Sequence, residues 1–231
     1  MAQLDDLLPE ISPEAPGAPE PSIIIAARNA VIEFCEKSLY WAAQADPVDI
    51  EAGVHTYDLD SPESDSIVAG VLLASHDGTP LDRVSEDQLD LDWPSYQNKY
   101  RDVLRYGLSE PWRQVTATKP CMYLCPTPRE IRLVGIPEAS LTGGLTMKVG
   151  VKPNPQSEEF GEVLYEDYHE ALAWGALYRL LMQPSKAWSN PQAATTYKVI
   201  FDQKINEAKG RRLASFTRQD TVTLRSKTYY K

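Results

Sequence analysis

The sequence is poor in cysteine and has no long apolar run. Its three cysteines, Cys35, Cys121 and Cys125, are too few and odd in number for a disulfide framework. The longest apolar stretch, residues 67–74, has eight residues, whereas a membrane-spanning helix needs about 20. The first residues carry acids where a signal peptide carries basic side chains. These absences predict a soluble, intracellular protein.

Basic residues are scarce in the first part of the chain and acidic residues are scarce in the last. Residues 1–100 contain 4 Lys or Arg and 20 Asp or Glu, and residues 101–203 contain 11 of each. Residues 204–231 contain 8 basic and 2 acidic residues. The formal net charge of −10 therefore hides an acidic front and a basic tail. An acidic front repels phosphates, which argues against general DNA binding by that part.

Motifs that carry chemistry are also missing. Cys121 and Cys125 resemble half a zinc site, but no second close pair of ligands accompanies them. They are better interpreted as buried or half-buried strand cysteines, and His169 as a packed or surface residue. No Gly-x-Ser-x-Gly, His-x-x-x-His or phosphate-binding loop is present. We therefore predict no catalytic, cofactor or metal site, and a protein that is not an enzyme.

The N-terminal part predicts an arm followed by a helix. Five prolines between residues 9 and 21 disfavour helix, so we predict an extended arm over residues 1–22. Leu4, Leu7, Leu8 and Ile11 are its candidate anchors. Ser22 then resembles a helix N-cap, and residues 23–41 carry an apolar stripe at helical spacing.

The middle of the chain predicts strands, and the part after it predicts two more helices. Apolar and polar residues alternate at 145–151, and short apolar runs separated by Pro and Gly fill much of residues 50–152. Ser85 and Gln88 have the spacing of a capping box. Helices are predicted from about Phe160 or Leu164 to Met182, and from Pro191, capped by Asn190, to about Arg212.

These elements predict an α+β fold with four parts. The first helix, within residues 23–45, packs against the C-terminal helical hairpin, residues 160–212, as a three-helix bundle. An antiparallel β-rich domain, residues 46–159, is inserted between them. Residues 1–22 and 213–231 form extended arms. The carboxylates of residues 46–92 predict either a solvated face or a surface for a basic partner.

The basic C-terminal arm is the candidate partner-binding segment. Its candidate residues are Arg211, Arg212, Arg218, Val222, Leu224, Arg225, Lys227, Tyr229 and Tyr230. Three interpretations are open: a charged terminus without fixed structure, a nucleic-acid arm that binds phosphates and stacks on bases, or a protein-docking arm. In the third, residues 221–225 add a strand to another chain's sheet. The alternation at Val222 and Leu224 favours docking.

The order of packing and turn residues resembles the head-to-tail adaptor (connector) proteins of tailed bacteriophages. The likeness spans almost the whole chain. It is carried by Leu8-Pro9-Glu10-Ile11, residues 16–19, 26–36 and Trp41, then Tyr57-Asp58-Leu59 and residues 145–151, then residues 165–177, Pro184, Trp188 and residues 197–208.

The resemblance implies a structural virion protein of the neck, assembled in the host cytoplasm. Such proteins form a ring of twelve subunits that docks on a portal protein above and on tail or nozzle proteins below. The ring lets DNA pass through its lumen without sequence-specific binding. Family members commonly grip the portal with a C-terminal extension, and residues 213–231 occupy the corresponding place. The alternative from the residues themselves is a nucleic-acid-binding accessory protein that acts through the basic arm.

Overall fold

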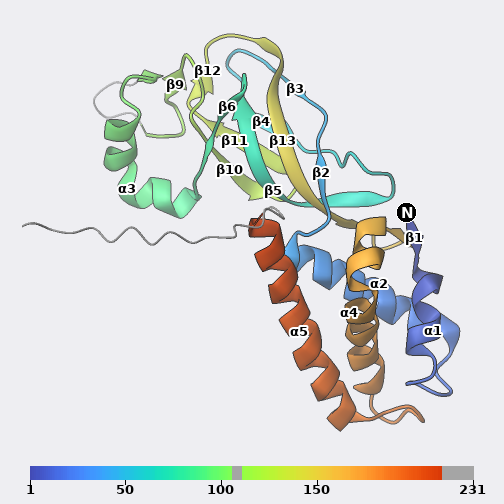
Figure 1. Ribbon diagram of the computed structural model, residues 1–231. Helices are drawn as coiled ribbons and strands as arrows, with labels where there is room; N and C mark the ends of the chain where they lie inside the picture. Colours follow the sequence, from blue (N-terminus) through green and yellow to red (C-terminus); the bar gives the residue numbers. More distant parts are fainter. Residues whose placement is uncertain (106–110, 215–231) are drawn as a thin grey trace, which may run out of the picture.

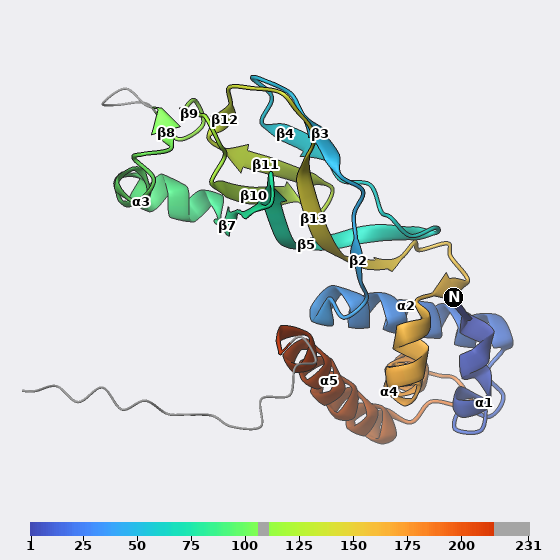
Figure 2. The same ribbon diagram turned by 45° about the horizontal axis from the view of Figure 1, so that its top comes forward.

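The long helices gather in one half of the molecule and most of the strands in the other (Figures 1 and 2). The structure, a computed structural model, describes residues 1–105 and 111–214. Within them it is a mixed α+β fold, as the sequence predicts, and it has five α-helices and several sheets. The chain enters the strand half after the second helix and returns for the fourth. No helix in the described ranges is long and apolar enough to cross a membrane.

The helical half is built around three long helices that contact one another. They are α2 (Glu20–Ser38), α4 (Glu162–Leu181) and α5 (Pro191–Leu213). α2 begins at Glu20 rather than after Ser22, because Pro21 fits the first turn of a helix, where no backbone donor is needed. Asn190 caps α5 as predicted, since its side chain accepts a hydrogen bond from the amide of Ala193.

Small residues let these three helices approach closely. Gly175 on α4 faces Phe201 of α5 and Ala30 of α2, and all three lie in the core. A Cβ atom built on Gly175 would lie 2.7 Å from Cε2 of Phe201 and 2.9 Å from Cβ of Ala30. These distances are well inside ordinary van der Waals contact. The packing of the three helices therefore depends on a residue without a side chain at this position.

The N-terminal segment is folded, so the prediction of an extended arm over residues 1–22 is wrong. Its first residues form β1 (Ala2–Gln3), a 3₁₀ turn (Leu4–Leu7) and the short α1 (Leu8–Ile11). Leu4, Leu7 and Ile11 are buried in the core that α2 and α4 share. Pro9 is tolerated because it lies in the first turn of α1. Burial of the leucines, which the sequence identifies as anchors, outweighs the extended tendency of the prolines.

The strand half contains several small sheets around two long strands. The largest sheet has the order β2-β13-β5-β6, with β3 also paired to β13. Its strands are β2 (Ala42–Gln44), β3 (Val48–Ile50), β5 (Ser66–His76), β6 (Thr79–Pro80) and β13 (Leu141–Pro153). All its pairings are antiparallel. The alternation at 145–151 is confirmed: Leu145, Met147, Val149 and Val151 are buried.

The other sheets are smaller and not wholly antiparallel, which corrects the prediction. Strands β7 and β10 pair in parallel, and so do β9 and β12. Parallel pairing needs a long crossover, which here is supplied by α3 with β8 and β9 in one case and by the β10–β11 hairpin in the other. The strands are β1 with β14 (Glu159–Phe160), β4 (Thr56–Asp58), β7 (Asp82–Arg83), β10 (Met122–Thr127), β11 (Glu130–Val134), β8 (Leu104–Arg105), β9 (Thr116–Ala117) and β12 (Ile136–Pro137).

The helix α3 (Glu86–Lys99) covers a second, smaller core in the strand half. Its capping box is confirmed: the Ser85 hydroxyl accepts from the Gln88 amide, and the Gln88 side chain accepts from the Ser85 amide. Leu89 is buried against strands β9 and β10, with Trp112 and Val115 in the same cluster. α3 lies at one side of the strand half (Figure 1).

Leu39 joins the two halves. It ends α2 in the left-handed conformation, with a φ of 51°. Its side chain lies against two glycines of the large sheet, Gly70 on β5 and Gly150 on β13. A Cβ on Gly150 would lie 2.9 Å from Cδ2 of Leu39. The absence of a side chain at Gly150 is therefore what allows the end of α2 to pack directly on the sheet.

Candidate interaction surfaces

The described part of the basic arm begins on the last turn of α5. Arg211 pairs with Glu207, with 2.6 Å between Nη2 and Oε1, and its guanidinium lies 5.7 Å from the ring centre of Tyr168. Arg212 is half-buried. The structure places these two residues side by side at the end of the helix. The remaining candidates lie outside the described residues: Arg218, Val222, Leu224, Arg225, Lys227, Tyr229 and Tyr230.

A charged cluster centred on Glu33 fixes α5 against the other helices. Glu33 lies on α2 and accepts hydrogen bonds from Lys37 of the same helix at 2.5 Å and from the Tyr178 hydroxyl of α4 at 2.9 Å. Arg179 of α4 also bonds to Glu33. The Nζ atom of Lys198 on α5 lies 3.6 Å from Oε1 of Glu33. One carboxylate therefore holds cations or donors from all three long helices.

The protonation of this cluster follows from its surroundings. Burial alone would raise the pKa of Glu33, but hydrogen bonds from Lys37 and Tyr178 and the charge of Arg179 lower it to about 2. Burial, helped by the bond to Glu33, raises the pKa of Tyr178 to about 12. At neutral pH the carboxylate is thus ionised and the phenol protonated, which is the arrangement that their hydrogen bond requires.

The cysteines and histidines do not gather. Cys35 is buried in α2, Cys121 is half-buried, and Cys125 is exposed, so the prediction of a buried or half-buried position is wrong for Cys125. Burial raises the pKa of the Cys121 thiol to about 12. The Nδ1 atom of His169 lies 3.0 Å from the Tyr165 carbonyl. Across residues 1–105 and 111–214, no three His, Cys, Asp or Glu side chains are placed to hold a metal ion.

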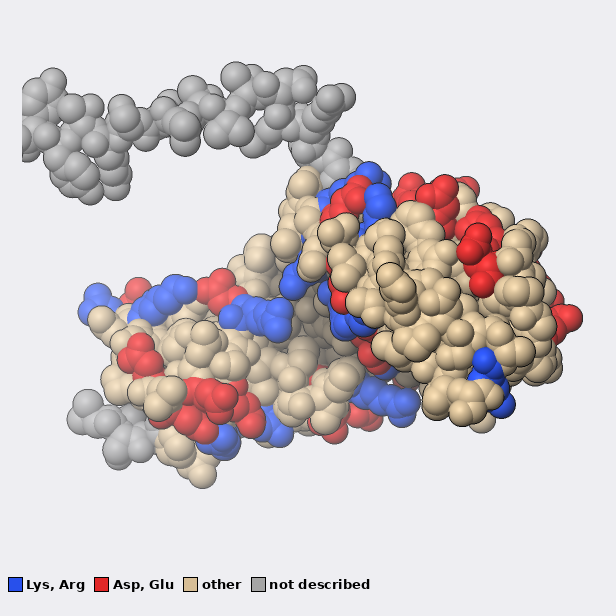
Figure 3. Space-filling model, turned by 90° about the horizontal axis from the view of Figure 1, so that it is seen from below, with Lys and Arg blue, Asp and Glu red and all other residues tan. Residues whose placement is uncertain are grey.

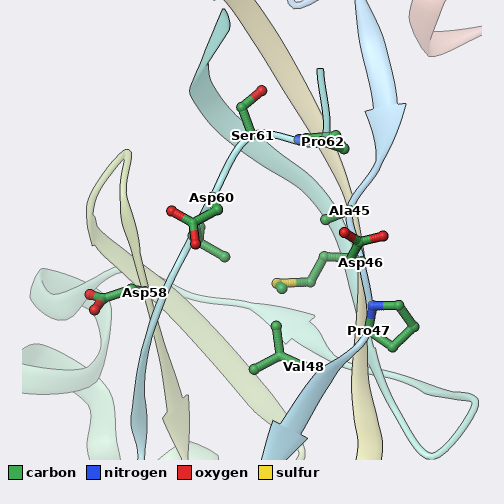
Figure 4. Close-up of a pocket in the computed structure, with 10 residues that line it drawn as sticks. Ala45, Asp46, Pro47, Val48, Asp58, Asp60, Ser61 and Pro62 are labelled. Carbon is green, nitrogen blue, oxygen red and sulfur yellow. The ribbon is translucent and has the colours of Figure 1, made fainter. Parts of the chain in front are cut away.

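Carboxylates of the acidic front line a small cavity of about 150 Å³ in the strand half (Figure 4). Asp46 lies at one side, Asp58 and Asp60 come from the segment across it, and Val48 contributes an apolar wall. The three carboxylates point in different directions and do not converge on one point. This arrangement matches the solvated acidic face that the sequence allows, and it lacks the converging oxygens of a cation site.

Charge is unevenly spread over the underside of the molecule (Figure 3). Seen from that side, the helical half shows a broad uncharged area bordered by acidic and basic side chains. Single apolar side chains are also exposed: Ile25 on α2 is 55% exposed, Leu73 on β5 is 67% and Leu91 on α3 is 86%. Apolar side chains exposed singly in this way are common on protein surfaces and do not by themselves mark an interface.

A family model described as SU10 adaptor protein matches residues 2–225 of the chain. The chain belongs to this family. The match covers nearly all residues and agrees with the resemblance to phage head-to-tail adaptors. A search of curated proteins found no match.

In a member of the SU10 adaptor family, the functional features are expected to be surfaces that contact other proteins. The sequence identified the basic arm but not the Glu33 cluster. The residues of that cluster are far apart in the chain, and each charged one taken alone has the pattern of a solvent-exposed side chain. Ile25, which lies beside the apolar stripe of the first helix in the sequence, is exposed in the structure. Only the packing of α2 against the N-terminal segment shows which of its faces stays open.

Proposed function

We propose that this protein is a structural head-to-tail adaptor in the neck of a tailed bacteriophage virion. A ring of twelve copies would join the portal protein to tail or nozzle proteins, and DNA would pass through the lumen. The family match over residues 2–225 carries this proposal. The protein would assemble in the host cytoplasm and perform no catalysis.

The division of the chain into parts belongs to the same proposal. Residues 23–45 and 160–212 would act as a three-helix bundle, and residues 46–159 as an inserted β-rich domain. The contacts among α2, α4 and α5 support the first part, and the separate core under α3 supports the second. Two bodies of different architecture would allow one adaptor to present different surfaces to its two sets of partners.

The basic arm is proposed to dock on a protein surface. Its residues are Arg211, Arg212, Arg218, Val222, Leu224, Arg225, Lys227, Tyr229 and Tyr230. Arg211 supports this role, because its ion pair with Glu207 leaves the side chain half-exposed at the end of α5. Alternating apolar residues with flanking bases suit a protein partner, since strand addition uses side chains of alternate positions.

The test of the adaptor role is particle assembly without this protein. We expect heads that have packaged DNA but carry no tails, and restoration of joining when the protein is supplied. Electron microscopy of assembled necks should show the protein as a closed ring below the portal. Particles that lack the protein and still join heads to tails would refute the proposal.

The second candidate is a nucleic-acid-binding accessory protein, favoured by the 8 basic against 2 acidic residues of 204–231. It predicts binding to duplex or single-stranded DNA with an affinity that falls steeply as salt increases. A mobility-shift series from low to high salt, with the full chain and with a chain lacking residues 215–231, decides between the two. Salt-dependent binding that needs the arm favours this candidate.

A further inference from the structure

One buried side chain of the strand half is able to become a cation. His76, the last residue of β5, is 6% exposed. Among residues 1–105 and 111–214, no other Lys, Arg or His side chain is buried. The Nδ1 atom of His76 is shielded from solvent and has no hydrogen-bond partner within the same residues. A neutral imidazole tolerates this position, whereas an imidazolium must lose its hydration there.

His76 lies at the joint between the large sheet and the sheet of order β4-β11-β10-β7. Its backbone pairs with Leu145 of β13 and with Thr79 of β6. Two residues with positive φ, Asp77 at 49° and Gly78 at 72°, form the tight turn between β5 and β6. Beyond β6 the chain enters β7, which pairs with β10. The β5–β6 hairpin therefore carries the connection between the two sheets.

Few hydrogen bonds hold this hairpin. β6 has two residues, which pair with Ser75 and His76 of β5. One of the two is Pro80, which has no amide hydrogen to donate. Beyond the paired residues, the Leu81 amide donates to the Ala74 carbonyl at 2.9 Å. So short a pairing is able to open locally while the long pairing of β5 with β13 stays closed.

The charges near His76 act in opposite directions. Asp77, the next residue, favours the protonated imidazole, and Lys119 disfavours it. The Asp77 carboxylate lies 3.6 Å from the Lys119 ammonium group, and both side chains are more than half exposed. Leu145 and Thr79, which pair with His76 on the neighbouring strands, carry no charge. Burial therefore dominates and lowers the pKa of His76 from 6.5, so the imidazole is neutral at pH 7.

We propose that the β5–β6 hairpin is an acid-sensitive joint, which protonation of His76 opens. The closed hairpin gives the Nδ1 atom of the imidazolium no hydrogen-bond partner, whereas the open hairpin exposes the ring to water. Protons therefore bind the open form more tightly and shift the population towards it. The joint is independent of the adaptor role, because it depends only on residues of one copy.

The direction of the pH effect follows from linkage. The pKa of His76 is lower in the closed form than in the open form. The closed form is therefore fully stable above about pH 6.5 and loses stability as the pH falls below that value. Because one proton is involved, the open population rises by at most about tenfold between pH 7.5 and pH 5.5. Glu33 stays ionised over this range, since its pKa is about 2, so the opening is confined to the strand half.

Hydrogen exchange of the full chain, followed by mass spectrometry at pH 7.5 and pH 5.5, tests this joint. Labelling times are scaled to the intrinsic exchange rate at each pH. Peptides that cover residues 74–84 should exchange faster at pH 5.5, by up to about tenfold, and peptides of α2 and α4 should not change. His76→Phe and His76→Asn, which cannot be protonated, should each abolish the response. The matched control, His55→Gln at a half-buried histidine outside the hairpin, should keep it.

Two further variants leave His76 in place and test the electrostatic cause. Lys119→Gln removes a charge that disfavours the imidazolium, and should therefore reduce the acid response. Asp77→Asn removes a charge that favours it, and should increase the response, while asparagine still suits the positive φ of the turn. A merely structural role of these two residues does not predict changes of opposite sign.

An acid response that persists in a folded His76 variant would overturn the proposal. So would a parent protein in which exchange at residues 74–84 does not depend on pH beyond the intrinsic rate. Equally faster exchange throughout the chain at pH 5.5 would also overturn it, because the opening would then be global. None of these results bears on the adaptor role, which particle assembly tests separately.

Discussion

Replacing Gly175 and Gly210 by alanine is expected to change the stability of this protein in opposite directions. Both glycines lie inside long helices, Gly175 in α4 and Gly210 in α5. Alanine is favoured over glycine in a helix by about 1 kcal/mol. A Cβ on Gly210 meets no atom within 4 Å. The G210A variant should therefore gain about 0.5–1 kcal/mol of unfolding free energy.

At Gly175 the same gain is opposed by steric overlap. The added Cβ would lie 2.7 Å from a ring carbon of Phe201 and 2.9 Å from Cβ of Ala30, where carbon atoms normally stay about 3.5–4.0 Å apart. Both neighbours are fully buried, so relief requires movement of α5 or α2. Overpacking that requires a buried helix to move costs about 2–3 kcal/mol, the upper part of the range for overpacked cores. We expect G175A to be destabilised by about 1–2 kcal/mol after the helix gain is subtracted.

Urea unfolding followed by circular dichroism measures both values under one set of conditions. The two variants differ from the parent by the same single methyl group, so each serves as the control for the other. The urea concentrations at which the two variants are half-unfolded should lie on opposite sides of the parent value. The slope of unfolding free energy against urea concentration should not change. A G175A protein as stable as the parent would show that the three helices are not packed as closely at this position as the structure indicates.

Two further predictions concern the same helices. Glu33→Gln should lower the free energy of unfolding by about 2 kcal/mol at pH 7. This is less than the shift in the Glu33 pKa gives at 1.36 kcal/mol for each pKa unit, because water screens the half-exposed Lys37. The pKa of Glu33 falls from 4.5 to about 2 on folding. The extra unfolding free energy of the parent is therefore complete above about pH 4.5 and is lost as the pH falls towards 2. Urea titrations at several pH values measure this, and the control variant, Glu166→Gln at an exposed position, should stay within about 0.5 kcal/mol of the parent. Asn190→Ala should cost about 1 kcal/mol by removing the bond to the Ala193 amide, whereas Asn190→Asp, which keeps an acceptor oxygen, should cost less in the same assay.

Local signals in the sequence were sufficient for several elements. The Ser85 capping box and the Asn190 cap depend on residues three positions apart, and both are present in the structure. The alternation at 145–151 also gave the correct buried face, because strand side chains alternate regardless of which strand lies next to them. These features are determined by near neighbours in the chain.

Features that depend on distant residues were predicted poorly. The prolines of residues 9–21 suggested an extended arm, whereas burial of Leu7 and Ile11 against α2 and α4 folds it. The parallel pairings of β7 with β10 and β9 with β12 join segments that the chain separates by other elements. A groove at the N-terminal end of α2 is lined by Asp5, Glu20 and Glu158, among others, so no window of the sequence contains it. Tertiary packing decides such features.

The contact of Leu39 with Gly70 and Gly150 has a mechanical consequence. Two covalent crossings connect the halves of the molecule, one after α2 and one before α4. Alone, two such crossings would act as a hinge about which the strand half could tilt. The Leu39 side chain, held against both long strands, resists that rotation, because tilting must first expose its apolar surface. We therefore expect the Leu39 contact to couple tilting of the strand half to movement of α2.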